Sequence, residues 1–361
     1  MHVTALVPYH PGTTPSQRYR IEQWLPYLAH AGIEVGLLPF ASSEFTSLLQ
    51  RPGHTLRKSW LMLAACARSA RLVSALPTAT VLLVHRAAWL AGPPLLEQTL
   101  RRAGHRLVYD FDDAIFRLHA GPGNRATAWL KMPGKTATLC RISDHVVVGN
   151  AYLADWARQH SPRVSVVPSS IDTDRYQPRS GATSAGRLVL GWSGSSTSQE
   201  YLEAFTPMLR DVARTELFDL RVISNRRPRL GDVPHTWREW SAATEESEVA
   251  AFDVGIMPLL NDEWALGKCA LKALQYMAAG VPTVASPVGA NCDLIDHGNN
   301  GLLATTTEEW LSGLGALAGD LELRRRLGLA GRATVERDYS MRASARKLEL
   351  VLTDLGVPAP V

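Results

Sequence analysis

A lysine beside a glycine is the feature of this sequence best suited to bind a phosphorylated ligand. Lys268 follows Gly267 in the stretch 261–289, where a loop leads into a short helix, a buried strand at 283–286 and a turn at Gly289. A lysine at the mouth of such a loop can neutralise a diphosphate as a point charge. Loop, helix start, strand and glycine turn are the parts with which a doubly wound sheet holds phosphates. An exposed lysine without a ligand is the simple alternative.

A second candidate phosphate site is the run GWSGSS at 191–196, which follows one predicted strand and precedes a helix. Glycines there let backbone N–H groups approach a phosphate, and the helix dipole adds partial positive charge. The signal is weak, because such loops often only turn the chain. The dinucleotide fingerprint GxGxxG is missing here and after the first strand, which disfavours a nicotinamide enzyme. Lys272, one turn into the helix after Lys268, could be a second ligand, although we expect its stem to snorkel along the helix.

Strands and helices must alternate along the chain to bring such loops to one sheet edge. In the first half, strand-like runs alternate with helical segments at 18–31, 57–75 and 94–103, and with two further helices that end near 141 and 160. The second half continues with helices at 199–215, 245–252, from 292, 308–317, 321–337 and 341–355. The strand-like runs lie at 2–9, 33–40, 80–86, 105–111, 144–150, 163–170, 187–194, 218–224, 237–244, 253–259 and 283–286. This alternation predicts α/β domains with doubly wound parallel sheets.

The predicted organisation is two Rossmann-like domains that face each other across a cleft. We expect an N-terminal domain at 1–172, a linker at 173–186 that is rich in proline, glycine and serine, and a C-terminal domain at 187–340. The last helix, at 341–361, is expected to cross back to the first domain. A chain of 361 residues has room for two such cores.

Composition favours a cytoplasmic protein. The four cysteines are scattered without metal-site spacing, which fits a reduced chain better than a disulfide scaffold. We expect no signal peptide, no transmembrane helix and no nucleic-acid partner. The basic segment at 57–75 carries Trp60 and Leu63 among arginines and a lysine. It could lie on an anionic membrane at the inner membrane face, or simply form the outer layer of a sheet.

Longer motifs in the second half resemble those of one enzyme family. GKCALKALQYMAAGVPTVASPVGANCDLI, followed by HGNNGLLA, is similar to the donor-binding segment of GT-B glycosyltransferases of the glycosyl transferases group 1 type. Further similar pieces occur in the same order: NAYLADWARQHSPRVSVVPSSIDTDRYQP, LGWSGSSTSQEYL and LRRRLGLAGRATVERDYSM. The resemblance covers nearly the whole chain and is strongest between about 144 and 340.

The resemblance implies a retaining, metal-independent transfer of a sugar from a UDP- or GDP-linked donor, held by the second domain, to a hydroxyl acceptor on the first. No cofactor is implied. His85 and Arg86 lie where the family places a histidine whose backbone carbonyl is close to the reacting carbon. The implied donor-site residues are Ser193, Gly194, Ser195, Ser196 and Lys268 for the diphosphate, Cys269, Ala270 and Leu271 for the sugar, Gln275 for the ribose, and Gly289 and Asn291 in the following turn.

Candidate residues for the acceptor side lie in the first half. Arg18 and Arg20, after the loop that contains Gly12, could meet an anionic acceptor or the diphosphate, or could form an exposed helical turn. The acidic cluster Asp110, Asp112 and Asp113 could face the acceptor. An Asp-x-Asp at a strand end could instead hold Mg²⁺ or Mn²⁺. A structural ion pair, or a helix cap by Asp113, is the third interpretation.

The sequence departs from the family pattern in two respects. Gly267 and Gln275 stand where the family has two glutamates, and Trp192 and Ser193 stand where it often has an arginine. An amide accepts one bond and donates one, whereas a carboxylate accepts from both ribose hydroxyls, so the donor would bind more weakly. Two alternatives follow: a catalytically silent nucleotide-sugar binder, and a sugar-nucleotide epimerase or hydrolase on the same fold.

Overall fold

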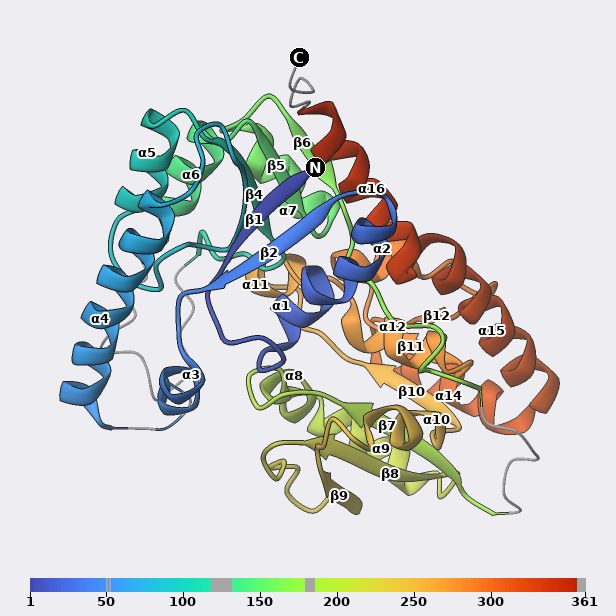
Figure 1. Cartoon of the computed structure of the whole chain (residues 1–361). Coiled ribbons are helices and arrows are strands. Elements are labelled where there is room, and N and C mark those ends of the chain that lie inside the picture. The colour runs from blue at the N-terminus through green and yellow to red at the C-terminus, as the bar shows by residue number, and fades with distance from the viewer. Residues whose placement is uncertain (50, 52, 118–131, 179–185, 356–361) are drawn as a thin grey trace. The chain divides into compact units, whose positions relative to one another are not determined.

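The chain divides into two compact units, each built on one parallel sheet (Figure 1). The structure, a computed structural model, describes residues 1–49, 51, 53–117, 132–178 and 186–355. Unit 1 comprises Met1–Ser169 and the segment from Ser344, and unit 2 comprises Ser170–Ala343. The predicted pair of Rossmann-like α/β folds is confirmed. Residues 179–185 of the expected linker and 356–361 of the expected last segment lie outside the described residues.

The sheet of unit 1 has the strand order β2-β1-β3-β4-β5-β6, with all strands parallel. β3 is buried along its whole length, as its unbroken apolar run predicts for a central parallel strand. β1 continues to β2 on one side, and β3 lies on its other side. The six strands are β1 His2–Val7, β2 Glu34–Pro39, β3 Val81–His85, β4 Arg106–Phe111, β5 His145–Val148 and β6 Val164–Val166.

Helices cover both faces of this sheet, with α4 and α5 on one side and α2 and α16 on the other (Figure 1). The last helix belongs to unit 1, and the Ser344 hydroxyl donates a hydrogen bond to the Pro168 carbonyl at 3.0 Å. The predicted return of the C-terminal helix is therefore confirmed. The helices are α1 Pro15–Arg20, η1 Glu22–Trp24, α2 Leu25–His30, α3 Ser43–Leu49, α4 Thr55–Ser74, α5 Leu95–Arg102, α6 Lys135–Ile142, α7 Ala151–Arg158 and α16 Met341–Asp354.

The sheet of unit 2 has the order β12-β11-β10-β7-β8-β9, and it is also parallel. Its strands are β7 Leu188–Ser193, β8 Phe218–Ser224, β9 His235–Glu239, β10 Val254–Met257, β11 Thr283–Ala285 and β12 Leu302–Leu303. Its helices are α8 Gln199–Ala204, α9 Thr206–Arg214, α10 Glu245–Ala250, α11 Glu263–Leu266, α12 Leu271–Ala278, α13 Ala290–Leu294, α14 Thr307–Gly319, α15 Leu321–Thr334 and η3 Val335–Tyr339, a π-helical turn.

Two helices that the sequence predicts as continuous are interrupted. The one expected at 18–31 begins at Pro15 and breaks at Ile21, whose φ of −125° and ψ of −60° are not helical. The one expected at 199–215 breaks at Phe205. In each case a proline occupies the first turn of the next helix, where its missing N–H would have been needed by a continuous helix.

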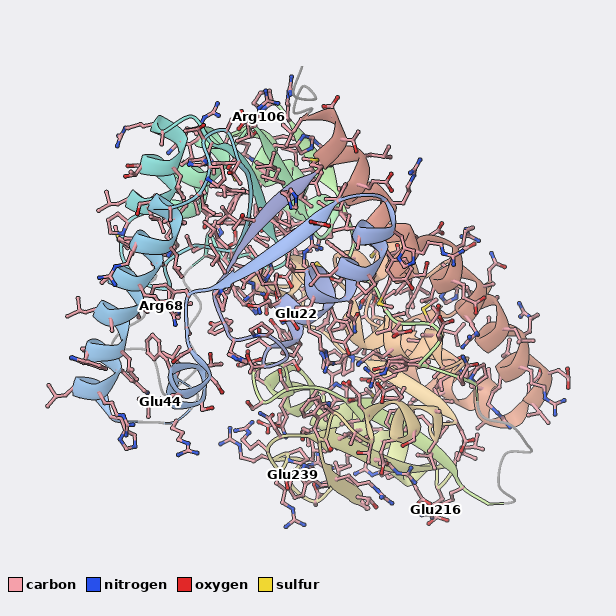
Figure 2. All side chains as sticks on the ribbon, in the orientation of Figure 1. Glu22, Glu44, Arg68, Arg106, Glu216 and Glu239 are labelled. Carbon is pink, nitrogen blue, oxygen red and sulfur yellow. The ribbon has the colours of Figure 1, made fainter. Side chains whose placement is uncertain are left out.

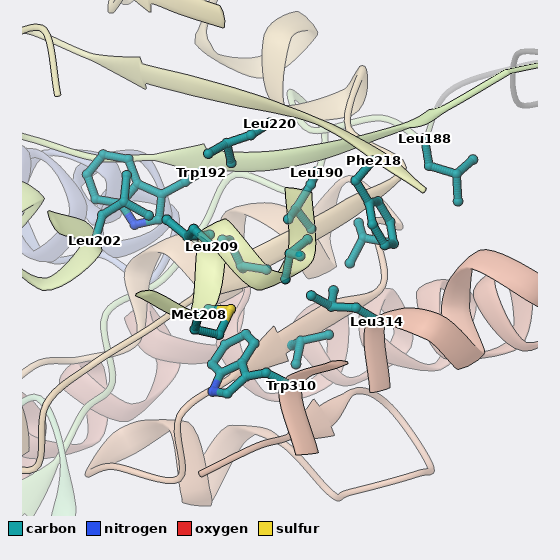
Figure 3. Packing of buried hydrophobic residues seen from close by; sticks show 14 of the residues in the cluster. Leu188, Leu190, Trp192, Leu202, Met208, Leu209, Phe218, Leu220, Trp310 and Leu314 are labelled. Carbon is teal, nitrogen blue, oxygen red and sulfur yellow. The ribbon is translucent and has the colours of Figure 1, made fainter. Parts of the chain in front are cut away.

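The core of unit 2 is an apolar cluster between its sheet and the helices α8, α9 and α14 (Figure 3). Trp192 from β7 and Trp310 from α14 are its largest buried side chains. Figure 3 shows Met208 and Leu209 of α9 beside them. Trp192 is the last residue but one of β7, so the loop that follows this strand starts from a rigid support.

Charged side chains cover the surfaces of both units (Figure 2). Arg57 pairs with Glu44 at 2.6 Å, and Arg187 pairs with Glu216 at 3.5 Å. Exposed pairs of this kind contribute little to stability. Among the described residues, no helix is both long enough and apolar enough to cross a lipid bilayer.

Candidate functional site

The candidate phosphate loops of unit 2 meet at one point of the sheet edge. β7 is followed by β8 on one side and has β10 on the other, so the connections after β7 and β10 leave in opposite directions. Open α/β sheets bind ligands at such a switch point, outside the carboxyl ends of the strands. The loop 194–198 follows β7. α11 follows β10, and Lys268 comes two residues after the end of α11. The two candidate motifs therefore belong to one site.

Gly194 is the point where the two motifs touch. A Cβ atom on this residue would lie 2.6 Å from Cε of Lys272 and 2.6 Å from the Trp192 ring. The Lys272 stem thus packs across the loop, and its ammonium lies 5.5 Å from the centroid of the Trp192 ring. The sequence favoured a snorkelling role for Lys272, whereas the structure brings its charge to the predicted phosphate loop.

Lys268 lies between two aromatic rings. Its ammonium is 5.4 Å from the centroid of the Tyr201 ring and 5.8 Å from that of Trp264, both within cation–π range. Tyr201 in turn donates from its hydroxyl to the carboxylate of Asp262, at 3.2 Å to each oxygen. Asp262 caps α11 by accepting from the Ala265 N–H. These aromatic and capping residues position the lysine. Sequence reasoning missed Tyr201, because its contact with Asp262 spans 61 positions.

The loop 193–196 offers fewer backbone donors than the sequence predicts. The Ser193 N–H donates to the Tyr276 hydroxyl at 2.8 Å, the Gly194 N–H to the Ile223 carbonyl, and the Ser196 N–H to Asn225 Oδ1. Within the described chain, the Ser195 N–H is the one donor of these four without a partner. The expected cradle of several N–H groups is therefore wrong, because tertiary contacts already use most of them.

α12 begins at the Cys269-Ala270-Leu271 segment without a side-chain cap. Ala270 has a φ of 54°, in the left-handed region that costs a non-glycine residue of order 1–3 kcal/mol. Strain of this kind is common where a backbone is held for a ligand. The first turn of an uncapped helix attracts anions through its N–H groups and dipole.

Gly289 brings the turn after β11 against the same site. Its φ is 54°, and a Cβ there would lie 2.7 Å from the Leu266 carbonyl oxygen, two residues before Lys268. Asn291, in the following helix, is buried and donates to the Ser286 carbonyl at 2.9 Å. Its Oδ1 has no partner within the described chain. An unpaired buried acceptor costs free energy unless a donor such as water or a ligand group reaches it.

Gln275 differs from the expectation of a ribose contact. Its amide nitrogen donates to the Tyr176 hydroxyl at 2.8 Å and to Glu245 Oε1 at 2.9 Å. The same Glu245 oxygen accepts from the Trp240 indole N–H at 2.9 Å. Both amide hydrogens are therefore directed at residues inside unit 2. A buried carboxylate does lie here, but it comes from α10, and no local sequence signal indicates it.

A polar hollow of about 670 Å³ lies elsewhere in unit 2, between α13, the 295–300 loop and η3. It is lined by Asp293, Asp296, His297, Arg337 and Tyr339, among others. None of the loop residues 193–198 or 263–271 lines it, so it is separate from the lysine site.

Arg20 of α1 forms a buried ionic network with His85 and Asp110 at the ends of β3 and β4. Arg20 is fully buried and makes bonds to both carboxylate oxygens of Asp110 and a bond of 2.7 Å to the Val167 carbonyl. The expectation that Arg20 meets an acceptor or a diphosphate is wrong, because its guanidinium is committed to the interior. His85 Nδ1 lies 2.6 Å from Asp110 Oδ2, and Nε2 lies 3.0 Å from the Ser16 hydroxyl, which the sequence did not single out.

Arg86 ties the other two aspartates. Its guanidinium bonds Asp112 at 2.7 Å and also Asp113. Burial alone would raise the pKa of Asp112, but the charges of Arg86, His85 and Arg20 together outweigh it and hold this pKa well below its usual range. Asp112 and Asp113 therefore form ion pairs with Arg86, as the ion-pair interpretation of the acidic cluster predicts. Within the described residues, no three acidic, histidine or cysteine side chains are grouped to hold a metal ion.

The turn after His85 is strained. Arg86 has a φ of 61°, and the Ala87 N–H donates to the His85 carbonyl at 2.7 Å, closing a three-residue turn. The Tyr109 hydroxyl donates to the Arg86 carbonyl at 2.9 Å and fixes it. The His85 carbonyl, expected beside the reacting carbon, is thus held rigidly at the end of β3.

Gly12 and Arg18 lie nearer the surface of unit 1. The Gly12 N–H donates to Glu22 Oε2 at 2.8 Å, and Glu22 is labelled in Figure 2. Arg18 is half-buried, bonds the Tyr19 hydroxyl at 2.7 Å and lies over the Tyr19 ring. Neither contact assigns an acceptor to these residues.

Comparisons with known proteins agree with this geometry. Residues 200–320 match the family described as Glycosyl transferases group 1. D-inositol 3-phosphate glycosyltransferase of Nocardia farcinica is 28% identical over 197 residues, which cover 46% of this chain. The chain spans only 42% of the length of this curated relative.

Solved structures match over nearly the whole chain. Sucrose-phosphate synthase from Thermosynechococcus elongatus has a TM-score of 0.73 at 16% identity, covering 98% of this chain and 99% of that one. HepE from Anabaena, solved with UDP and glucose, has a TM-score of 0.69 at 15% identity and covers 98% and 100%. A glycosyltransferase from Rickettsia africae has a TM-score of 0.68 at 12% identity, with 98% of each chain covered. Residues 200–320 of this chain are thus similar to the Glycosyl transferases group 1, and the chain as a whole has the GT-B fold of these solved structures.

Proposed function

We propose that this chain is a retaining glycosyltransferase that moves a sugar from a nucleotide-diphosphate sugar to a hydroxyl acceptor without a metal ion. The observation that carries the proposal is the convergence of Lys268, Lys272 and the Gly194 loop at the switch point of unit 2, inside the matched region. Two cations beside an uncapped helix start suit a diphosphate that gains charge as it leaves. UDP is the nucleotide that we propose for the donor, because HepE was solved with UDP and UDP-glucose.

The protein groups divide the work in this proposal. Lys268 and Lys272 neutralise the diphosphate, while the Ser195 N–H and the start of α12 donate hydrogen bonds to it. The Asn291 side-chain oxygen accepts a hydrogen bond from a hydroxyl of the nucleotide sugar. No protein nucleophile is required: the acceptor oxygen bonds the anomeric carbon as the bond from that carbon to the diphosphate breaks, and a phosphate oxygen of the donor accepts the acceptor's proton. The acceptor belongs to unit 1, near the rigid His85 turn, and the reaction takes place in the cytoplasm.

Lys268→Ala tests the assignment of the main cation. We expect turnover with saturating donor to fall at least about tenfold, since a charge acting on the leaving group is lost. Steady-state nucleotide release from UDP-glucose that depends on an added hydroxyl acceptor, followed with a coupled assay, measures this. Lys347→Ala, an exposed lysine on α16, is the matched control and should keep full activity. Near-normal turnover of Lys268→Ala would remove the lysine from the mechanism.

A catalytically silent nucleotide-sugar binder is the second candidate, and the engaged amide of Gln275 favours it. Calorimetry with UDP, GDP and their sugars separates the two candidates. Donor binding without product across a panel of acceptors would support the silent binder. Release of nucleotide in the absence of any acceptor would instead point to the epimerase or hydrolase alternative.

A further inference from the structure

One face of α4 in unit 1 presents large apolar side chains to solvent. Leu56, Trp60 and Leu63 are 88%, 67% and 70% exposed. The spacings of four and three residues place them on one side of the helix, and the exposed Ala67 extends the row by another turn. We call these four residues the α4 apolar row. Single exposed leucines are ordinary, whereas a continuous row indicates a contact surface.

This row is not the side by which α4 packs on its own unit. The opposite side of α4 contributes Leu61, Met62 and Ala65 to an apolar cluster with Phe40 and Phe45. An outer helix of a globular domain normally has one apolar stripe and one polar side. α4 has two apolar stripes, and only the inner one is used for folding.

The charges of α4 are of one sign. The helix carries Arg57, Lys58, Arg68 and Arg71 and has no acidic residue in its 20 positions. Glu44 of α3 pairs with Arg57, while Arg68 bonds the Phe40 carbonyl and so keeps its net charge (Figure 2). A surface complementary to this face must therefore be apolar along its centre and anionic beside it.

We propose that α4 is a docking surface for an anionic lipid membrane. Leu56, Trp60 and Leu63 enter the boundary between headgroups and acyl chains, and the basic side chains contact lipid phosphates. A straight helix of 20 residues is about 30 Å long and can lie flat on a bilayer along its length. This surface is independent of the lysine site in unit 2, and it would hold the enzyme where lipid-linked hydroxyl acceptors are found.

The proposal is tested by sedimentation of the full chain with vesicles. Wild-type protein should bind vesicles of equimolar phosphatidylglycerol and phosphatidylcholine, bind pure phosphatidylcholine at least about tenfold less, and dissociate at high salt. The double variant Leu56→Glu/Leu63→Glu should lose at least about tenfold in binding to the anionic vesicles. Leu95→Glu/Leu350→Glu, at 52% and 56% exposed positions on α5 and α16, is the charge-matched control and should bind like wild type.

Several results would overturn the proposal. The proposal fails if the wild-type protein does not bind anionic vesicles at low salt. It also fails if the α4 double variant binds these vesicles as well as wild type does. Wild-type self-association that the double variant abolishes, without vesicle binding, would assign the row to a second copy of the chain. Thermal stability and the melting shift with UDP should not change in the α4 variant. If UDP does not raise the melting temperature of the wild-type protein, the proposed function is contradicted, whereas the membrane result is unaffected.

Discussion

The buried Arg20–Asp110–His85 network is the clearest residue-scale feature of unit 1. A buried ion pair contributes little net stability by itself, but removal of one partner leaves an uncompensated charge in the interior. Asp110 has two such partners, Arg20 and His85. This network supports the end of β3, where Arg86 is strained.

The network predicts an acid-dependent loss of stability. Burial would raise the pKa of Asp110, but Arg20 and the His85 hydrogen bond lower it below its ordinary value. A carboxyl whose pKa is lower in the folded than in the unfolded state stabilises the folded protein. This stabilisation is complete above the unfolded-state pKa of about 4 and is lost as the pH falls through the folded-state pKa. Asp110→Asn should cost about 3–5 kcal/mol at pH 7 and should flatten the acid limb of the stability curve.

Urea denaturation of wild type and variant between neutral and acid pH measures both effects. The control is Asp232→Asn, which breaks an exposed pair with Arg210 and should change stability little. An Asp110→Asn protein with the wild-type pH profile would contradict this account of the network.

Among the secondary-structure elements, the turn at Gly289 links β11 to the lysine segment. Gly289→Ala should destabilise the protein by about 1–3 kcal/mol, because φ is positive and the new Cβ would meet the Leu266 carbonyl. The displaced Leu266 would move Lys268, so the affinity for UDP should fall as well. Gly315→Ala in α14, where a Cβ meets nothing within 4 Å, is the control and should be neutral or slightly stabilising. Unchanged stability and UDP affinity of Gly289→Ala would refute the close approach.

The sequence predicts most strands and long helices of this fold, because buried parallel strands are unbroken apolar runs. It places helix breaks poorly, as at Ile21 and Phe205, where a proline five and two positions further along sets the boundary. The short helices α3 and α11 were not predicted, since a few residues with a cap carry almost no periodic signal.

The candidate site shows the same limit more sharply. Lys268 and the Gly194 loop are visible in the sequence because each is a local motif. The contacts that decide their roles join distant residues: Gln275 with Glu245 across 30 positions, and Arg20 with Asp110 across 90. Side-chain partners at such separations follow from tertiary packing and leave no pattern in the chain.

At the scale of the whole molecule, unit 1 is completed by the last helix of the chain. Leu348→Ala should cost about 2–5 kcal/mol, because this side chain of α16 is buried and a cavity would remain. Leu350→Ala, on the exposed side of the same helix, should cost far less. Chemical denaturation followed by circular dichroism compares them, and equal effects of the two substitutions would mean that α16 is not an integral part of unit 1.

The discontinuity of unit 1 also has a consequence for synthesis on the ribosome. Residues 1–169 emerge first, but the helix that closes their sheet is translated only after all of unit 2. Unit 2 is continuous in the chain, so it can finish folding while unit 1 still exposes the apolar surface that α16 will cover. The half of the protein that is made first is therefore the half that matures last, and it is the half that a chaperone would be expected to attend.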